Sequence, residues 1–258
     1  MRHPTCWIGG IIIACSVIVA VLAPVLAPDD PYRSGIAMLD LPSRAHWFGT
    51  DDLGRDVLSR VIYGARASLT IGLGAALTAT VVGVPIGLLA GTLRGRVDAA
   101  LVALIDLFIS LPGLVLALII TAMIGANLRN LVLVLGFVMW PAIARLVRGQ
   151  ALALRETLFV EAARATGGTR LWIIRRHVWP GVLPVVTAQF ATSVSFAIFT
   201  SASLSFLGLG IPPPEADWGG MVRQGFDYLA VNPLLSLAPG AAVSLTVMGF
   251  YLIGTTIK

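Results

Sequence analysis

Six long apolar stretches recur along the sequence, separated by polar or basic segments. A helix needs about 20 apolar residues to cross a lipid bilayer. On that rule we expect six transmembrane helices, at residues 7–27, 66–93, 99–124, 128–144, 185–207 and 237–257. Charged residues make up only 12% of the chain, against about 25% in an ordinary soluble domain. The sequence therefore predicts an all-α membrane protein in which residues 1–258 form one transmembrane domain.

The placement of Lys and Arg predicts the orientation, because cytoplasmic loops carry an excess of these residues. If both termini are cytoplasmic, 11 basic residues lie inside and 7 lie outside. The inside set consists of Arg2, Arg94, Arg96, Lys258 and the seven arginines from Arg145 to Arg176. We therefore expect a multi-pass protein with both termini in the cytoplasm, an external loop at 28–65 and a basic cytoplasmic loop at 145–184.

Several kinds of chemistry are excluded by what the sequence lacks. The only lysine is Lys258, so no glycine-rich phosphate loop with a lysine is present and we expect no ATP hydrolysis by this chain. Cys6 and Cys15 lie in or beside the first apolar stretch, which argues against a disulfide framework or a thiolate metal site. The three histidines do not complete a nucleophilic catalytic set, and no basic face interleaved with aromatics indicates nucleic acid. We expect a non-catalytic chain without its own cofactor or metal.

The cytoplasmic loop 145–184 predicts two short helices joined by a glycine turn. The first is expected from Glu156 to Thr166, and Gly167-Gly168 is expected to end it because glycine adopts the left-handed cap conformation. Thr169 is a candidate N-cap for a second helix from Arg170 to Val178. Pro180 and Pro184 are expected to end that helix before the fifth span.

The first of these helices has a narrow face of mostly small side chains, formed by Leu158, Ala162 and Ala165. Glu161 and Arg164 offer an exposed charge pair three residues apart. A helix this thin fits a groove on a partner protein. The alternative is an amphipathic helix that rests on lipid headgroups, helped by the loop's arginines.

Several motifs in this loop and elsewhere carry a family resemblance. Glu161-Ala162-Ala163, a glycine four residues later (Gly167) and Pro180 thirteen residues further on resemble the EAA loop of ABC importer permeases. The external stretch from Pro42 to Arg60 is similar to the C-type permeases of the dipeptide, oligopeptide and nickel transporters. So are the following segments: Trp140-Pro141, 144–150, Arg176-His177 and 202–210. The likeness runs from about residue 24 to residue 254, with departures at Trp179, where the family usually has Leu, and Gly181, where it often has Asn.

The resemblance implies a type I ABC importer permease fold with a cytoplasmic coupling helix, in the inner membrane of a prokaryote. In that family the coupling helix sits in a groove of the ATP-hydrolysing subunit. Carried over to this chain, the docking residues are Glu161, Ala162, Ala163, Arg164, Gly167 and Gly168, and the loop is anchored by Arg145, Arg148 and Pro180. The implied partners are a second homologous permease, two ATPase subunits that bind ATP and Mg, an extracytoplasmic substrate-binding protein and membrane lipid.

The external loop holds a cluster of polar residues. Thr50 is a candidate N-cap of a helix over 50–62, with Asp51 and Asp52 placed favourably at its positive end. By resemblance the loop faces the substrate-binding protein, and the candidate contacts are His46, Gly49, Asp51, Arg55 and Asp56. These side chains do not have the spacing of metal ligands, so we expect no metal there.

Two sets of polar residues lie within the predicted spans. Asp106 is expected to have a hydrogen-bond or arginine partner near the cytoplasm, because an unpaired carboxylate is costly there. The hydroxyl-rich fifth span either bonds to its own backbone one turn back or lines a polar translocation path, for which the candidates are Gln189, Ser193, Thr200 and Ser203.

The glycines at 83, 87 and 91 make a smooth face on the second span, suited either to packing within the chain or to a subunit contact.

Taken together, the resemblance implies a permease for peptides. Alternatives are a nickel or haem permease of the same family, or a stand-alone secondary transporter or channel, for which Asp106 is the sole candidate coupling carboxylate.

Overall fold

The computed structural model describes residues 4–93 and 95–256, and in these ranges the regular elements are all helical. Three of the basic residues used to predict orientation, Arg2, Arg94 and Lys258, lie outside the described residues. The helices, in chain order, are α1 Pro4–Val21, α2 Ala23–Leu26, α3 Val57–Thr92, α4 Arg96–Ile109, α5 Gly113–Ile124, α6 Leu128–Arg155, α7 Leu158–Ala165, α8 Arg170–Ile173, η1 Ile174–Val178, α9 Trp179–Leu204, η2 Ser205–Leu209, α10 Trp218–Phe226 and α11 Leu234–Thr256.

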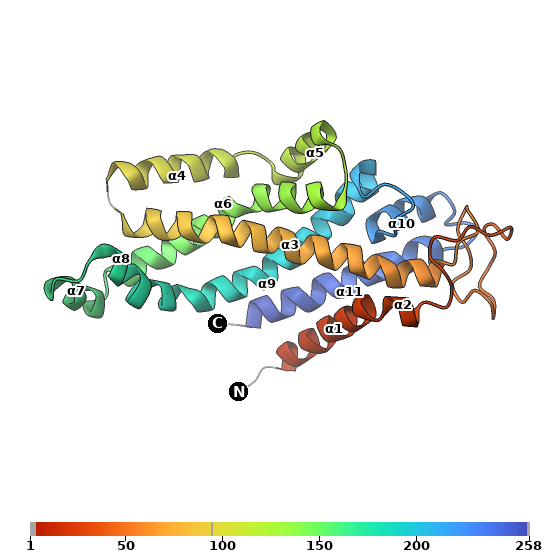
Figure 1. The fold of residues 1–258 in the computed structure, drawn as a ribbon, viewed down its shortest axis with the longest axis horizontal. Helices are drawn as coiled ribbons and strands as arrows, with labels where there is room; N and C mark the ends of the chain where they lie inside the picture. The colour runs from red at the N-terminus through yellow and green to blue at the C-terminus, as the bar shows by residue number, and fades with distance from the viewer. Residues whose placement is uncertain (1–3, 94, 257–258) are drawn as a thin grey trace.

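The long helices α3, α6, α9 and α11 run side by side along the molecule, with α1 beside α11 and α4 and α5 on the outer side of α6 (Figure 1). The helical hairpin α7–α8 lies at one end of this bundle. A cap of loops lies at the other end; this loop cap comprises residues 28–56, α10 and the loops that flank α10. The first turn of α1 and the last turn of α11 point toward the α7–α8 end (Figure 1).

The pairing of α3 with α6 is built on glycines. A Cβ added to Gly83 would lie 2.6 Å from the Trp140 carbonyl oxygen, and one on Gly91 would lie 2.6 Å from the Ala151 Cβ. Small residues let helix backbones approach in lipid, where packing drives association. The predicted glycine face therefore packs within the chain's own bundle, which decides between the two alternatives raised by the sequence.

Among the described residues, four helices are long and apolar enough to cross a membrane: α3, α6, the continuous helix Arg170–Leu209 and α11. The bent pair α4–α5 counts as a fifth if it is one span, and the apolar helix Thr5–Val21 is shorter than the others. The six-span count stays a prediction.

The third predicted span, 99–124, is not one continuous helix. The chain bends by 81° between α4 and α5, at residues 110–112. Pro112 lacks a backbone N–H and disfavours the helical conformation at the preceding Leu111, which explains the break.

The predicted end of the second cytoplasmic helix is also wrong. Pro180 and Pro184 do not stop it; the helix runs from α8 through η1 into α9. The segment η1 is a π-turn, in which the Trp179 N–H bonds to the Ile174 carbonyl. This wider turn accommodates both the missing N–H and the ring of the proline that follows it.

The predicted helix over 50–62 starts seven residues late. Val57 is the first residue of α3, and Asp56 rather than Thr50 caps it, with its side chain accepting from the Ser59 N–H at 2.8 Å. Thr50 is engaged elsewhere: its hydroxyl donates to the Ala37 carbonyl at 2.6 Å and accepts from the Asp40 N–H at 2.9 Å.

Candidate functional site

The helix α7 is held to the bundle by one face and exposes the other. Val160 is fully buried and Ala163 is 8% exposed, in the same apolar cluster as Ala151 of α6 and Ile173 of α8. Glu161, Ala162 and Arg164 are exposed on the opposite side. The small-residue face predicted from the sequence (Leu158, Ala162 and Ala165) is exposed as well, and Leu158 is 83% exposed.

The end of α7 is a Schellman motif, a hydrogen-bonded helix stop. The Gly168 N–H bonds to the Ala163 carbonyl and the Gly167 N–H bonds to the Arg164 carbonyl, both at 3.0 Å. Gly167 has φ +86°, and a Cβ added there would meet nothing within 4 Å. The left-handed glycine cap predicted at this position is confirmed, and any other side chain is limited by the backbone rather than by space.

The second arm of the hairpin starts as the sequence predicts. The Thr169 side chain accepts from the Trp172 N–H at 3.4 Å and caps α8. Leu171 and Trp172 are exposed beside it, and the Trp172 ring meets His177 edge-on at 5.0 Å. This apolar surface next to α7 was not predicted, although its residues stand between arginines in the sequence.

Arg145 and Arg148, predicted to anchor the loop, both lie in the second half of α6 and pair with acids of α4. Arg148 donates two bonds to Asp98, at 2.8 and 3.0 Å. Arg145 pairs with Asp106, so Asp106 has the arginine partner that the sequence predicts. Pro180, the third predicted anchor, is exposed near the start of α9.

A cavity of about 570 Å³ lies where the α4–α5 bend meets α6, α9 and α11. Its lining is largely apolar and aromatic, with Gln189, Thr192, Ser193 and Ser195 as polar groups. Phe196, Phe199 and Tyr251 line it and are 54%, 58% and 56% exposed. The cavity therefore opens on the surface of this chain, and it falls in the size range of small-molecule sites.

Two of the four path candidates lie at this cavity. Gln189 and Ser193 line it and contact each other, with the Gln189 amide 3.4 Å from the Ser193 Oγ. Thr200 is buried and bonds to the Phe196 carbonyl, while Ser203 bonds to the Phe199 carbonyl and lines a second hollow beside α10. Backbone bonding, the other interpretation of the hydroxyls, thus holds at these two positions.

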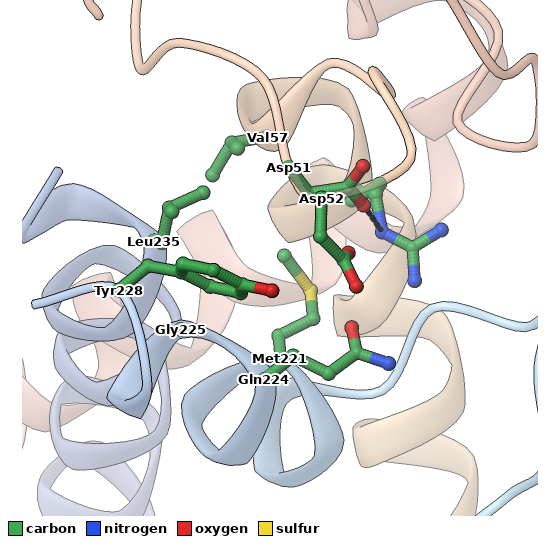
Figure 2. A pocket seen from close by; sticks show the side chains of 9 residues that line it. Asp51, Asp52, Val57, Met221, Gln224, Gly225, Tyr228 and Leu235 are labelled. Atoms are coloured by element: carbon green, nitrogen blue, oxygen red, sulfur yellow. Dashed lines mark ion pairs between the residues drawn. The ribbon is translucent and has the colours of Figure 1, made fainter. Parts of the chain in front are cut away.

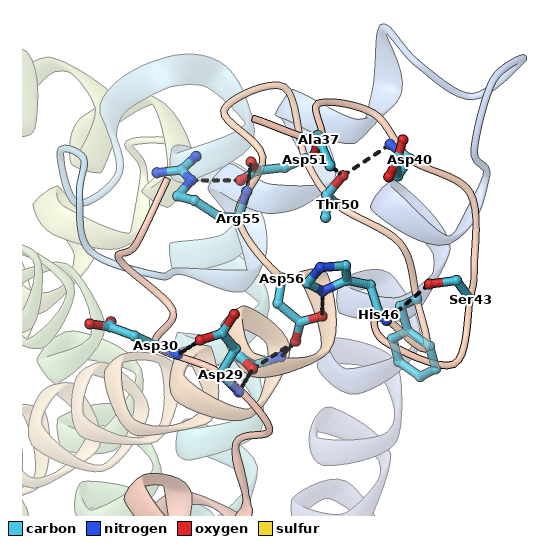
Figure 3. A network of polar contacts seen from close by, with 12 residues as sticks. Asp29, Asp30, Ala37, Asp40, Ser43, His46, Thr50, Asp51, Arg55 and Asp56 are labelled. Atoms are coloured by element: carbon cyan, nitrogen blue, oxygen red, sulfur yellow. Dashed lines mark hydrogen bonds and ion pairs between the residues drawn. The ribbon is translucent and has the colours of Figure 1, made fainter. Parts of the chain in front are cut away.

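The loop cap buries most of the residues predicted to contact a binding protein. Asp56 is 3% exposed, and it accepts from Ser59 while also pairing with His46 at 3.0 Å (Figure 3). Asp51 is 7% exposed and its carboxylate lies 2.7 Å from Arg55 Nε and 3.5 Å from Arg60 Nε. Gly49 is buried too, and only His46 of the five candidates is partly exposed. These residues hold the loop together, because buried charges need partners.

Beneath Asp51 a hollow of about 20 Å³ separates the loop from α10 (Figure 2). Met221, Gln224 and Tyr228 face it from the α10 side. It has room for little more than one water molecule, so it is not a substrate site.

On the same side Asp217 caps α10 by accepting from the Gly220 N–H at 3.0 Å, and burial raises the pKa of the Asp217 carboxyl above its ordinary value.

The side chains that the cap exposes include four large apolar ones. Ile36, Met38, Leu41 and Trp47 are 101%, 60%, 61% and 67% exposed. They stand in the sequence as short apolar runs within an otherwise polar loop, and that pattern is the signal that could have identified them.

The family model described as "binding-protein-dependent transport system inner membrane component" matches residues 83–258. The chain belongs to this family of permease components. Its matched region includes the α7–α8 hairpin and the cavity.

Relatives cover nearly the whole of this permease. The "Probable D,D-dipeptide transport system permease protein DdpC" of Escherichia coli K12 is 38% identical over 97% of this chain and 84% of the relative. The glutathione transport system permease protein GsiD of Pectobacterium atrosepticum is 34% identical, with coverage of 100% and 86%. The dipeptide transport system permease protein DppC of Alkalihalophilus pseudofirmus is 35% identical, with coverage of 97% and 83%.

Solved structures show the fold. The permease is similar to a chain of the MetNI methionine ABC transporter in an inward-facing conformation, with a TM-score of 0.60 and 21% identity. That match covers 78% of this chain and 97% of the other. The type I ABC importer permease fold expected from the sequence is confirmed.

Proposed function

We propose that this permease is one of two homologous membrane subunits of an ATP-driven importer of di- and oligopeptides. Relatives that are 34% to 38% identical over nearly the full length carry names of D,D-dipeptide, dipeptide and glutathione transport systems, and all three of those substrates are short peptides. Peptides delivered by an extracytoplasmic binding protein pass through the membrane between the two permeases. The open, aromatic and amide-lined cavity supports this, since it is half of a site that a facing subunit completes.

The single observation that supports the mechanism is that α7 packs against the bundle with one face and exposes the other. Val160 and Ala163 fix it to α6 and α8, while Glu161, Ala162 and Arg164 remain free for a partner. A partner that moves α7 therefore moves α6 as well. ATP and Mg bind to two partner ATPase subunits, each with a groove for such a helix, and this chain does no hydrolysis. Both termini and the hairpin lie in the cytoplasm.

The alternative location of α7, among lipid headgroups, is less favourable on this geometry. A headgroup-anchored helix needs a broad apolar face. In α7 the bulky apolar residues at the exposed surface are Leu158 and Phe159, and both are at its first turn. The rest of the exposed face carries Glu161, Ala162 and Ala165.

Replacement of Gly167 tests the coupling role. Gly167→Val forces a β-branched residue into φ +86° and is expected to abolish the ATP hydrolysis stimulated by dialanine-loaded binding protein. Gly167→Asn is the matched control, because Asn accepts the left-handed conformation and the space is open. ATPase activity would be measured on the full complex in proteoliposomes, with insertion checked by size-exclusion chromatography. Full stimulation in Gly167→Val would exclude α7 as the coupling element.

A further inference from the structure

The helix α4 is the least embedded of the long elements. Among its described side chains only Ile105 is buried, whereas Leu104, Leu107 and Ile109 are 40% to 61% exposed. Its apolar attachment to α6 is completed by Phe108, which meets Phe137 and Trp140 edge-on with ring centroids 5.3 and 5.5 Å apart. With α5 it lies on the outer side of α6 (Figure 1).

Two ion pairs add to this small apolar contact. Asp98 on the first turn of α4 receives both bonds of the Arg148 guanidinium, and Asp106, two turns later, pairs with Arg145. The order of partners is reversed along the two helices, so α4 and α6 run antiparallel in this region. Charges next to hydrocarbon are costly when unpaired, so these pairs resist separation of the two helices.

The two helices that these ion pairs join, α4 and α6, lead to different parts of the molecule. On the α6 side, Arg148 is followed by one helical stretch to Arg155 and then by α7. On the α4 side, the helix ends at the bend 110–112, whose residues are all exposed, and Ile109, Leu111 and Gly113 line the cavity. None of the three residues of the bend is buried within this chain.

We propose that α4 is a transmission arm. The pairs Asp98–Arg148 and Asp106–Arg145 make α4 follow the cytoplasmic end of α6, so that a displacement of α7 turns α4 about the bend 110–112 and reshapes the cavity wall. This inference rests on the proposed function. It assigns Asp98, Asp106, Arg145 and Arg148 as positioning residues that act on the cavity through the bend.

Charge exchange tests the arm. Asp98→Asn and Arg148→Gln are each expected to lower ATP-dependent dialanine uptake by about tenfold while stimulated ATP hydrolysis is retained. The reason is that ATP hydrolysis by the partner subunits is then no longer coupled to movement of the cavity wall. The double variant Asp98→Arg with Arg148→Glu rebuilds the pair in reverse and should recover most of the uptake. Arg96→Gln, an equal loss of charge on the first turn of α4, is the control and should transport normally.

A purely structural role predicts different results. Uptake and hydrolysis would then fall together with the amount of inserted complex, and the charge exchange would restore all three together. That result overturns the proposal. Spin labels at Leu107→Cys and Leu77→Cys, two exposed positions on α4 and α3, give a second measurement in a Cys6→Ser, Cys15→Ser background. Their distance should change on vanadate trapping of the intact complex and stay constant in Asp98→Asn; a constant distance in the parent protein also overturns the proposal.

The two hypotheses fail in different ways. If the parent complex does not take up dialanine, the proposed function is wrong as to substrate, and the spin-label distances still test the arm. If uptake is normal and Asp98→Asn transports like the parent, only the arm is wrong.

Discussion

Asp51 is the residue on which the loop cap depends most. Its carboxylate faces the buried guanidinium groups of Arg55 and Arg60, and it also accepts from the Leu53 and Arg55 N–H groups. Arg60 in turn donates to the Pro31 carbonyl at 3.0 Å, which ties the start of the loop to α3. One carboxylate thus pairs with two buried guanidinium groups and accepts the backbone N–H groups of a tight turn.

Asp51→Asn is expected to destabilise the cap by roughly 3–5 kcal/mol, because the loss of one partner leaves buried charge uncompensated. Limited proteolysis of the 28–56 loop in the purified protein measures this as faster cleavage. Asp52→Asn removes the neighbouring, less buried carboxylate and should leave the cleavage rate near that of the parent. Equal rates for all three proteins would contradict the assignment.

At the scale of elements, the α3–α6 pair makes the most extensive helix–helix contact of the molecule. A Cβ on Gly87 would lie 2.5 Å from the Ala144 carbonyl oxygen and 2.8 Å from the Val147 Cβ. Backbone atoms cannot move aside as a flexible side chain can. The close approach therefore continues along the part of α6 that bears Arg145 and Arg148.

Gly87→Leu should separate α3 from α6 and lower stability by about 1–3 kcal/mol or more, as overpacking does. Thermal unfolding in detergent, followed by size-exclusion chromatography, measures the shift. Gly149→Ala on α6, where an added Cβ meets nothing within 4 Å, should be neutral or slightly stabilising. A Gly87→Leu protein as stable as the parent would show that the interface is looser than these distances imply.

Local signals predicted the hairpin well and long-range contacts poorly. Gly167 and Thr169 could be assigned because a helix cap depends on a few neighbouring residues. The bend at 110–112 was missed because Ser110 and Pro112 lie within a long stretch of mostly apolar residues. Asp51 and Arg55 were taken for contact residues because burial in the cap depends on α10, about 165 residues away, which the sequence did not predict as a helix.

At the scale of the whole molecule, polar groups gather at the two ends and apolar surface covers the middle. Exposed apolar side chains such as Leu77, Val81 and Met123 lie along the helices between the ends. The α7–α8 hairpin and the outer turns of α1 and α11 lie toward one end and the loop cap at the other (Figure 1). The hairpin and these turns therefore share one side, and their cytoplasmic location stays a prediction.

Single cysteines test this orientation in a Cys6→Ser, Cys15→Ser background. Ser43→Cys in the loop cap should react with an impermeant maleimide in intact spheroplasts, and Thr166→Cys at the end of α7 should react only after permeabilisation. Both positions are exposed, so access to the compartment alone decides the labelling. The reverse pattern would invert the topology and remove α7 from the ATPase side.

The loop cap joins parts of the chain that are synthesised at different times. Asn232 bonds to the Phe48 carbonyl, Tyr32 to Glu215 and the Trp218 indole to the Val61 carbonyl, across 157 to 184 residues. While the ribosome is still producing the second half of the protein, the first loop has none of these partners. The cap therefore cannot complete these contacts until residue 232 has been synthesised, and a nascent or truncated permease that lacks α10 and α11 presents an open loop to proteases that survey membrane assembly.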